Sequence, residues 1–245
     1  MSDLLKFKQT LDDSKTIVGF TGAGISTEAG ISDYRSQGGI WEKFTPVYLS
    51  EFIDEPEKRV LYWQRKQALW DSIKNARPTK AHRFFVDLHH QGKLRGLITQ
   101  NIDGLHEKSG LPSDLIINLH GNTLEIICLG CQTISLAEPL METLDANDPP
   151  LCDRCGGLLK PNTISFGQQL VAADLARAER MVRSCDLLIA AGSTLQVHPA
   201  ASFPLVAKEA GAKLAIITLS KTPLDGYADF VFNEKLGNFL KKLEQ

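Results

Sequence analysis

The last third of the chain alternates helix and strand, and this alternation limits the fold more than any other feature of the sequence. Strands that alternate with helices form parallel βαβ units with right-handed crossovers. Ligands bind beyond the carboxyl ends of such strands. The predicted elements here are helices at 172–184, 199–210 and 235–244, and strands at 186–191, 213–219 and 228–232. The sequence therefore predicts an α/β fold with a parallel sheet.

A glycine-rich stretch at residues 19–30 follows a helix predicted at 3–13 and a strand predicted at 16–20. Its glycines at 22, 24 and 30 fit a tight strand-to-helix turn, where backbone N–H groups and a helix start approach a diphosphate. The spacing Gly-x-Gly-x5-Gly is longer than the usual dinucleotide pattern, and no acidic residue closes a second strand about 20 residues on. The stretch alone fits a nucleotide site and an ordinary glycine turn equally well.

Polar residues follow a strand predicted at 96–100. Residues 100–106 hold an amide pair, a carboxylate and a histidine in one loop between a strand and a helix. Asn101 or Asp103 would serve equally well as a helix cap, so the loop alone does not define a site.

His120 ends a further predicted strand at 115–119, and its imidazole can act as a general base. A lone histidine is more often structural. Gly192, Ser193 and Thr194 end another strand and are predicted to open a helix, which would add N–H and hydroxyl donors for a phosphate or a ribose.

Four of the five cysteines form two Cys-x2-Cys pairs separated by 20 residues, which is the spacing of a zinc ribbon. Four thiolates fill the coordination sphere of a tetrahedral ion and leave no position for water or substrate, so the predicted zinc is structural. The alternative is two buried reduced pairs or a redox site. Cys185 stands alone at the start of a strand and is predicted to be a small buried hydrophobe.

All three tryptophans lie between residues 31 and 78. A helix predicted from about 56 to 75 begins near Pro56, where proline suits the first turn, and ends before Pro78. This segment is interpreted as a helical insertion that carries an aromatic cluster. Such a cluster is usually core packing.

The 245 residues allow one or two domains and a sizeable core. A formal net charge of -2 gives no field for a polyanion, and residues 122–160 hold mixed charges and no aromatic side chain, which argues against nucleic acid as the main partner. The first residues do not form a secretory signal, and no apolar run approaches the roughly 18 residues that span a bilayer. We therefore expect a cytoplasmic protein with no membrane partner.

Six motifs, in register along the chain, resemble those of the sirtuins, which are NAD-dependent protein lysine deacylases. The match extends from about residue 14 to 222. Its motifs are residues 22–36, 100–106, 120–121, 161–167 and 192–199 and the four paired cysteines.

The resemblance implies a Rossmann-type doubly wound parallel sheet with a small domain made of a helical module and a zinc-ribbon module. NAD and an acyl-lysine peptide would meet in the cleft between the large and small domains. The NAD-binding domain would comprise residues 1–36, 79–121 and 161–245, the helical module 37–78 and the zinc module 122–160. One structural zinc per chain would be held by Cys128, Cys131, Cys152 and Cys155.

The resemblance also implies roles for residues in the cleft. Asn101 and Asp103 would hold the nicotinamide and its ribose, Gln100 would contact that ribose, and His120 would act as base on the ribose hydroxyls. Other cofactor contacts would come from Gly22, Ala23, Gly24, Thr27, Asp33, Tyr34, Arg35, Ile102, Gly192, Ser193, Thr194 and Thr218. The peptide would lie as an added strand between the backbone of Ile164, Ser165, Phe166 and Gly167 and the backbone around Val197.

Several residues depart from the sirtuin pattern. Ser32 replaces the proline before Asp33, and Tyr34 replaces the usual phenylalanine on the cofactor loop. Ser165 and Gln168 replace a phenylalanine and a glutamate, which would change peptide contacts. Thr218 stands where an asparagine commonly meets the adenine ribose. None of these changes touches the residues assigned to catalysis.

Tyr62 and Arg65 bear on the choice of acyl group. Their spacing resembles the pair that sirtuins preferring acidic acyl groups place at the base of the acyl pocket, where a guanidinium clamps a carboxylate. Residues three apart on a helix share a face. The Tyr-Trp-x-Arg sequence also occurs in a mitochondrial branch with weak deacetylase activity and broader acyl or ADP-ribosyl chemistry, and an arginine on a helix is most often just solvated.

The predicted activity is therefore NAD-dependent deacetylation, or desuccinylation and demalonylation, or both. The alternatives are a mono-ADP-ribosyltransferase that uses NAD and an NAD-binding sensor without turnover.

Overall fold

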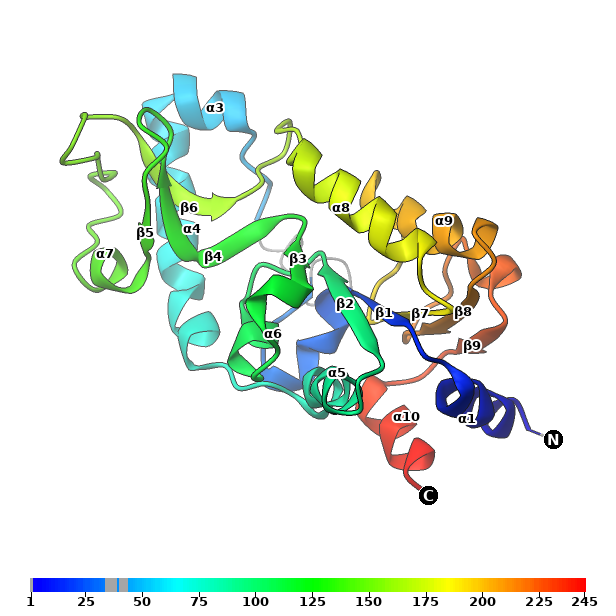
Figure 1. The fold of residues 1–245 in the computed structure, drawn as a ribbon. Coiled ribbons are helices and arrows are strands. Elements are labelled where there is room, and N and C mark those ends of the chain that lie inside the picture. Colours follow the sequence, from blue (N-terminus) through cyan, green and yellow to red (C-terminus); the bar gives the residue numbers. More distant parts are fainter. Residues whose placement is uncertain (1, 34–38, 40–43) are drawn as a thin grey trace.

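The computed structural model describes residues 2–33, 39 and 44–245, which form two lobes (Figure 1). The larger lobe is built on a six-stranded sheet and contains both ends of the chain. The smaller lobe is built on a three-stranded sheet, and α4 (Pro56–Asn75) runs along it.

The six strands of the large sheet are parallel and lie in the order β3-β2-β1-β7-β8-β9. The order reverses between β1 and β7, as in a doubly wound sheet, and ligands bind at such a reversal. The strands are β1 (Ile17–Thr21), β2 (Leu94–Thr99), β3 (Ile116–Asn118), β7 (Leu187–Ala191), β8 (Lys213–Ile217) and β9 (Phe230–Phe232). The predicted doubly wound α/β fold is confirmed.

The strands of the large sheet end level with one another. Thr21 pairs with Thr99 on one side and Ala191 on the other. Asn118 pairs with Thr99, and Ile217 pairs with Ala191. The residues that follow these strands therefore share one edge of the sheet.

Helices cover both faces of this sheet, and side chains of each strand alternate between two apolar cores. Leu187 and Ile189 pack under one set of helices, and Leu188 and Ala190 pack under the other. The first set comprises α1 (Asp3–Asp13), α5 (Lys80–His90) and α10 (Leu236–Leu243), and the second α8 (Ala172–Arg183) and α9 (Phe203–Glu209). Burial on both faces explains why these strands are apolar throughout.

The small lobe packs helices against an antiparallel sheet. Its strands β4 (Gly121–Cys128), β5 (Ile134–Leu136) and β6 (Leu159–Thr163) lie in the order β5-β4-β6, and its other helices are α3 (Leu49–Asp54) and α7 (Glu138–Glu142). The predicted aromatic cluster does form core packing, with Trp63 and Trp70 buried. Trp41 lies outside the described residues.

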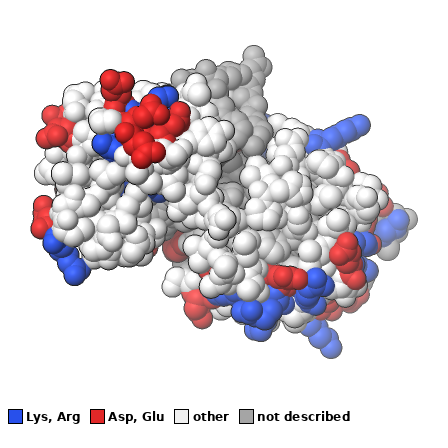
Figure 2. Space-filling model, turned by 90° about the horizontal axis from the view of Figure 1, so that it is seen from above, with Lys and Arg blue, Asp and Glu red and all other residues white. Residues whose placement is uncertain are grey.

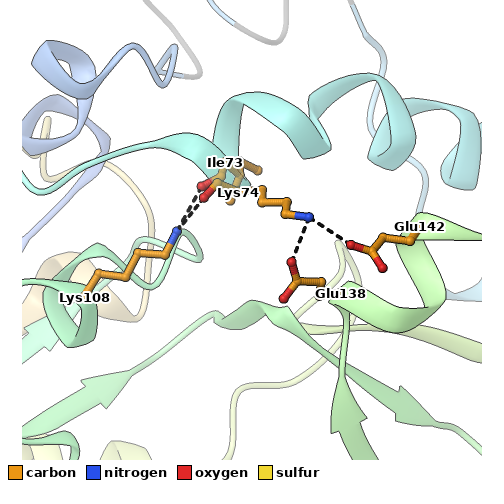
Figure 3. Close-up of polar contacts among 5 residues, drawn as sticks. All are labelled: Ile73, Lys74, Lys108, Glu138 and Glu142. Atoms are coloured by element: carbon orange, nitrogen blue, oxygen red, sulfur yellow. Dashed lines mark hydrogen bonds and ion pairs between the residues drawn. The ribbon is translucent and has the colours of Figure 1, made fainter.

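The end of α4 is joined to both lobes (Figure 3). Lys74 lies 2.7 Å from a carboxylate oxygen of Glu138 and 3.1 Å from one of Glu142, both on α7. Lys108, on α6 (Leu105–Lys108) of the large lobe, donates to the carbonyls of Ile73 and Lys74 at 3.2 and 3.1 Å. This helix end therefore links the small lobe to the large lobe.

Two predicted helix starts at the sheet edge are wrong. After Gly22 the chain forms two 3-10 turns, Ala23–Ile25 and Thr27–Ala29, and no α-helix begins in the described residues up to 33. After Gly192 the chain stays irregular until the 3-10 turn Ala200–Ser202, and within this segment Leu195 has a positive φ of 54°, which an α-helix does not allow. The edge therefore offers backbone N–H groups without an α-helix dipole behind them.

Two further 3-10 turns, Ser113–Leu115 and Asp225–Tyr227, complete the described elements. None of the helices in the described part of the chain has both the length and the apolar character needed to cross a bilayer.

Candidate active site

A cavity of about 1390 Å³ lies at the edge where the parallel strands end, and both lobes line it. It brings together all the described residues that the sequence predicts for cofactor and substrate. These are Gly22, Ala23, Gly24, Thr27, Asp33, Tyr62, Arg65, Gln100, Asn101, Ile102, Asp103, His120, Ile164, Ser165, Phe166, Gly167, Gly192, Ser193, Thr194, Val197 and Thr218. Tyr34 and Arg35 lie outside the described residues.

Charged side chains gather on the outer parts of both lobes, and the described surface between them carries few (Figure 2). Lysine, arginine and acidic side chains are intermixed in these outer regions. The face seen in this view therefore has no extended surface of a single charge.

Glycines let the loops after β1 and β7 touch. Gly24 N–H donates to the Gly192 carbonyl at 2.8 Å, and Gly22 N–H donates to the Ala191 carbonyl at 3.1 Å. A Cβ atom on Gly24 would lie 2.8 Å from the Gly192 oxygen, and one on Gly22 would lie 2.9 Å from it. The glycine spacing is thus explained by backbone contact between two loops. Backbone and small side chains form the resulting wall, and a Cβ atom would fill the space in front of it. Such a wall lets the diphosphate and riboses of NAD approach the backbone N–H groups closely.

Gln100 and Ser193 join two strand ends across the cavity. Ser193 Oγ donates to Gln100 Oε1 at 2.7 Å and accepts from Leu195 N–H at 3.2 Å. Thr218 follows β8, and its N–H donates to the Phe232 carbonyl at 3.1 Å. The side of the cavity predicted to bind ribose is therefore internally braced.

Asn101 and Asp103 are buried and share one partner, Ser26. Ser26 Oγ donates to Asp103 Oδ2 at 2.7 Å and accepts from Asn101 Nδ2 at 3.2 Å. Asp103 Oδ1 also accepts from the N–H of Leu105, the first residue of α6, at 2.9 Å. Burial raises the pKa of Asp103, and the bonds from Ser26 and Leu105 oppose that rise. Both side chains are thereby held in fixed orientations.

His120 presents one ring nitrogen to the protein backbone. Its Nδ1 lies 2.8 Å from the Gln100 carbonyl, which can only accept, so Nδ1 carries the proton. Nε2 then carries the lone pair of the neutral ring. Burial lowers the pKa of His120, partly offset by the bond to the Gln100 carbonyl. The neutral imidazole that a general base requires is therefore the favoured form at neutral pH.

Tyr62 and Arg65 both line the cavity from α4, as their helical spacing predicts. Arg65 Nη1 donates to the Thr45 carbonyl, and the guanidinium lies 5.5 Å from the centre of the Phe44 ring. Arg65 Nε is buried, and no described residue bonds it with hydrogen-bond geometry. The Tyr62 hydroxyl is buried as well, with Thr163 and Lys66 beside it. One buried guanidinium N–H is therefore left for a ligand.

Lys66 adds a second cation to this wall. Its Nζ lies 5.3 Å from the centre of the Tyr62 ring. Burial raises the pKa of Tyr62, but the charges of Lys66 and Lys160 and nearby hydrogen bonds outweigh burial and leave that pKa below its ordinary value. The small-lobe end of the cavity is thus electropositive.

The segment predicted to pair with a peptide runs along the cavity beside His120. Ile164 N–H donates to the His120 carbonyl at 2.8 Å. Ser165 N–H donates to Gln168 Oε1 at 3.0 Å, and Leu49 N–H donates to the Phe166 carbonyl at 2.9 Å. The Gln168 side chain thus binds the N–H of Ser165. Hydrogen bonds from this side chain and from neighbouring backbone fix the conformation of the segment without a peptide.

The four paired cysteines form one cluster in the small lobe, and their Sγ atoms all lie within 4.8 Å of one another. Two Sγ–Sγ distances are 3.5 and 3.8 Å, and a tetrahedral zinc with thiolates at about 2.3 Å requires about 3.8 Å. Cys131 N–H and Gly157 N–H point at sulfur atoms at 3.4 Å, as they do around thiolates. A Cβ on Gly157 would lie 3.0 Å from Cys128 Sγ. These residues fit a structural zinc.

Cys185 is buried in the large lobe and donates to the Val182 carbonyl at 3.2 Å. Burial raises the pKa of its thiol to about 12. It is the inert small hydrophobe that its sequence position predicts.

Three features of the cavity lie beyond the residues that the sequence predicts for it. Ser26 lies inside the glycine motif, and its hydroxyl between glycines is the one sequence feature that indicates a polar contact there. Lys66 lies four residues after Tyr62 and therefore on the same helix face. Residues 234–236 also line the cavity, and nothing local in the sequence indicates this.

Comparisons with known proteins agree with the geometry. Residues 22–199 match the model of the Sir2 family. The chain is 43% identical over 243 residues to an NAD-dependent protein deacetylase 1 of Bradyrhizobium diazoefficiens, covering 98% of this chain and 96% of the relative. It is 37% identical over 243 residues to an NAD-dependent protein deacylase 1 of Archaeoglobus fulgidus, covering 97% of this chain and 95% of the relative. A solved structure of Sir2 with a p53 peptide and NAD+ is similar with a TM-score of 0.87 at 33% identity, covering 99% and 97% of the two chains.

Proposed function

The chain belongs to the Sir2 family, and from that membership we propose that it is an NAD-dependent protein lysine deacylase. It transfers the acyl group of a modified lysine to the ADP-ribose part of NAD and releases nicotinamide. The observation that carries this proposal is that Asn101, Asp103 and His120 line one cavity with the glycine loops after β1 and β7. Mono-ADP-ribosyl transfer and NAD sensing without turnover are not favoured, because the matched relatives carry deacetylase and deacylase names.

The chain's own residues divide the work. Asn101 and Asp103, fixed by Ser26, hold the nicotinamide end of NAD, and Gln100 contacts the adjoining ribose. The loops at 22–27 and 192–194 face the diphosphate, and Thr218 faces the adenine ribose. His120 removes a proton from a ribose hydroxyl through Nε2 after nicotinamide has left. The peptide lies between residues 164–167 and Val197.

His120→Ala tests the assignment of the base. Acyl transfer should fall by about 100- to 10,000-fold, the usual contribution of general acid-base catalysis, while NAD still binds. The measurement is formation of O-acyl-ADP-ribose from an acyl-peptide and NAD. Full activity in the variant would remove His120 from the mechanism, and an ADP-ribosylated protein without O-acyl-ADP-ribose would favour a transferase.

The pH dependence of the wild type gives a second test of this base. Because a base must be unprotonated, the pKa that governs the acid limb of kcat/KM should lie below the ordinary histidine value of 6.5.

We propose further that the acyl pocket accepts chains that end in a carboxylate. The buried and unpartnered Arg65 Nε supports this, as do the neighbouring Tyr62 hydroxyl and Lys66. Among the described residues, no Asp or Glu forms an ion pair with Arg65 or Lys66. A carboxylate on the acyl chain would supply the missing anion.

Arg65→Met tests this specificity. Loss of hydrogen bonds to a charged partner should lower desuccinylation by about 10- to 100-fold, with deacetylation nearly unchanged. Gln64→Met is the matched control, since Gln64 lies on the same helix and bonds Asn147 rather than the cavity. An equal loss of both activities in Arg65→Met would reject the clamp.

The remaining assignments complete the proposal. The zinc is structural, one per chain, because four cysteines fill its coordination sphere. The partner is an acyl-lysine protein or peptide rather than nucleic acid, in keeping with the mixed charges in Figure 2. The compartment we propose is the cytoplasm.

A further inference from the structure

Lys160 is a buried cation whose charge acts on Tyr62 and which has no role yet in the proposed reaction. It lies on β6 and is 1% exposed, among the largest fully buried side chains of the described chain. No described Asp or Glu forms an ion pair with it. Burying an unpaired ammonium is costly, and an apolar side chain of similar volume would often be at least as stable there. The charge is therefore held in place by something other than an ion pair.

The Lys160 ammonium bonds the backbone of its own strand. Nζ donates to the Pro161 carbonyl at 3.0 Å and to the Thr163 carbonyl. The pairing of β6 with β4 is interrupted beside these residues, between Asn122 and Ile126 of β4. The side chain thus holds the end of β6 at the point where the regular ladder is broken.

This strand end is in direct contact with the backbone of His120. The peptide group after Thr163 continues into Ile164, whose N–H donates to the His120 carbonyl at 2.8 Å. Gly121 has a positive φ of 77°, and a Cβ there would lie 2.0 Å from the Asn162 oxygen. Two backbones this close cannot move independently. A shift of residues 162–164 would therefore shift His120.

We propose that Lys160 is a positioning residue for His120, acting through the Thr163–Ile164 peptide group. The inference rests on the proposed function, since it concerns the step in which His120 serves as base. The nicotinamide end of the site depends instead on Ser26, Asn101 and Asp103, which stand on other elements. Loss of the Lys160 ammonium therefore impairs acyl transfer and spares nicotinamide release.

Lys160→Met and Lys160→Arg test the proposal with acetyl-peptide and NAD. Misplacing a catalytic group by about 1 Å can cost about 100-fold, so we expect Lys160→Met to lower O-acetyl-ADP-ribose formation by about 10- to 100-fold. Exchange of labelled nicotinamide into NAD and the KM for NAD should stay close to the wild-type values. Lys160→Arg, which keeps the charge and the donors, should restore most of the acyl transfer. Lys58→Met, at a partly exposed lysine of the same lobe that pairs with Glu51, is the matched control.

The other outcomes are equally informative. Equal losses of exchange and acyl transfer in Lys160→Met would show that Lys160 only supports the lobe, and an unchanged acyl transfer would overturn the proposal outright. If Lys160→Met does not fold, Lys160→Gln takes its place under the same criteria. Failure of both to fold would also count against a positioning role. A wild-type protein that forms no O-acetyl-ADP-ribose would refute the proposed function itself, which is a distinct result.

Discussion

The two lobes around the cavity are stabilised by different means. In the large lobe, β1 and β7 are buried at every residue, and helices supply apolar side chains to both faces of the sheet. In the small lobe, every residue of β5 is exposed, with Ile134 at 53% and Leu136 at 71%. One apolar cluster around Trp63 and Trp70 supports that lobe. The large lobe is stabilised by its own apolar core. The small lobe depends more on the zinc held by its four cysteines and on the ion pairs between Lys74 and α7.

The residues proposed to bind NAD and those proposed to select the acyl group are divided between the two lobes. The residues proposed to bind NAD stand on strand ends whose register is set by the large core. The residues proposed to select the acyl group, Tyr62 and Arg65, stand on α4, which packs in the small lobe. Acyl selectivity can therefore change through the small lobe without disturbance of the cofactor edge.

Removal of the metal is expected to have the largest effect and to separate the two lobes. With a strong chelator, or with Cys128→Ser, the small lobe should lose most of its structure, because structural zinc contributes about 10 kcal/mol or more to the folding of small zinc modules. The large lobe should stay folded. Amide hydrogen exchange should show protection lost across residues 121–163 and kept in β1 and β7.

Cys185→Ser is the control for this experiment, because Cys185 lies in the large lobe outside the metal cluster. It should leave the zinc content at one per chain. Equal loss of protection in both lobes on zinc removal would show that they fold as one unit, and the comparison would fail.

Gly24→Ala is expected to damage the large lobe and spare the small one. The new Cβ would lie 2.8 Å from the Gly192 oxygen and 2.9 Å from its Cα, so the loops after β1 and β7 must separate. Overpacking of this kind costs about 3 kcal/mol of unfolding free energy. The KM for NAD should rise by about tenfold or more, since misplaced binding groups lose that much, and the zinc content should not change.

Gly226→Ala is the matched control, because its new Cβ would meet nothing within 4 Å. A wild-type KM for NAD in Gly24→Ala would mean that contact between the two loops is unnecessary for cofactor binding.

Most helices and strands of the large lobe could be predicted from the sequence. In the small lobe the helix α4 and the four-cysteine cluster could be predicted, but the strands could not. Helices such as α8 and strands such as β7 carry local signals, namely apolar runs that end on glycine or polar residues. β4 carries none, because its buried residues are Thr123, Ile126 and Cys128, spaced three and two apart. Neither a helix nor a regular strand has that spacing, and the interrupted pairing with β6 is its cause.

The site shows the same limit. Residues at the strand ends could be predicted, since parallel strands bring them to one edge. The bond from Ser26 to Asp103 joins residues 77 apart, and the bond from Gly237 N–H to Glu28 joins residues 209 apart. Contacts of that kind follow from the completed fold and leave no local pattern.

Mild acid is expected to give the smallest effect, again confined to the large lobe. His82 and His106 are buried there with ring centres 4.7 Å apart, and residues 44–75 and 121–163 of the small lobe contain no histidine. Burial lowers the pKa of His82 to about 4 and that of His106 well below its ordinary value.

Below pH 6.5 the unfolded chain therefore takes up protons that the folded chain cannot, so the free energy of unfolding should fall as the pH falls toward about 4. Each of these histidines should contribute about 1 kcal/mol of that fall between about pH 6.5 and 5.5. Chemical denaturation at several pH values would measure it. His82→Gln should remove its share of the slope, whereas His90→Gln, at an exposed position on α5, should not. A slope that is the same in His82→Gln and in the wild type would mean that the buried histidines do not set the acid sensitivity of the large lobe.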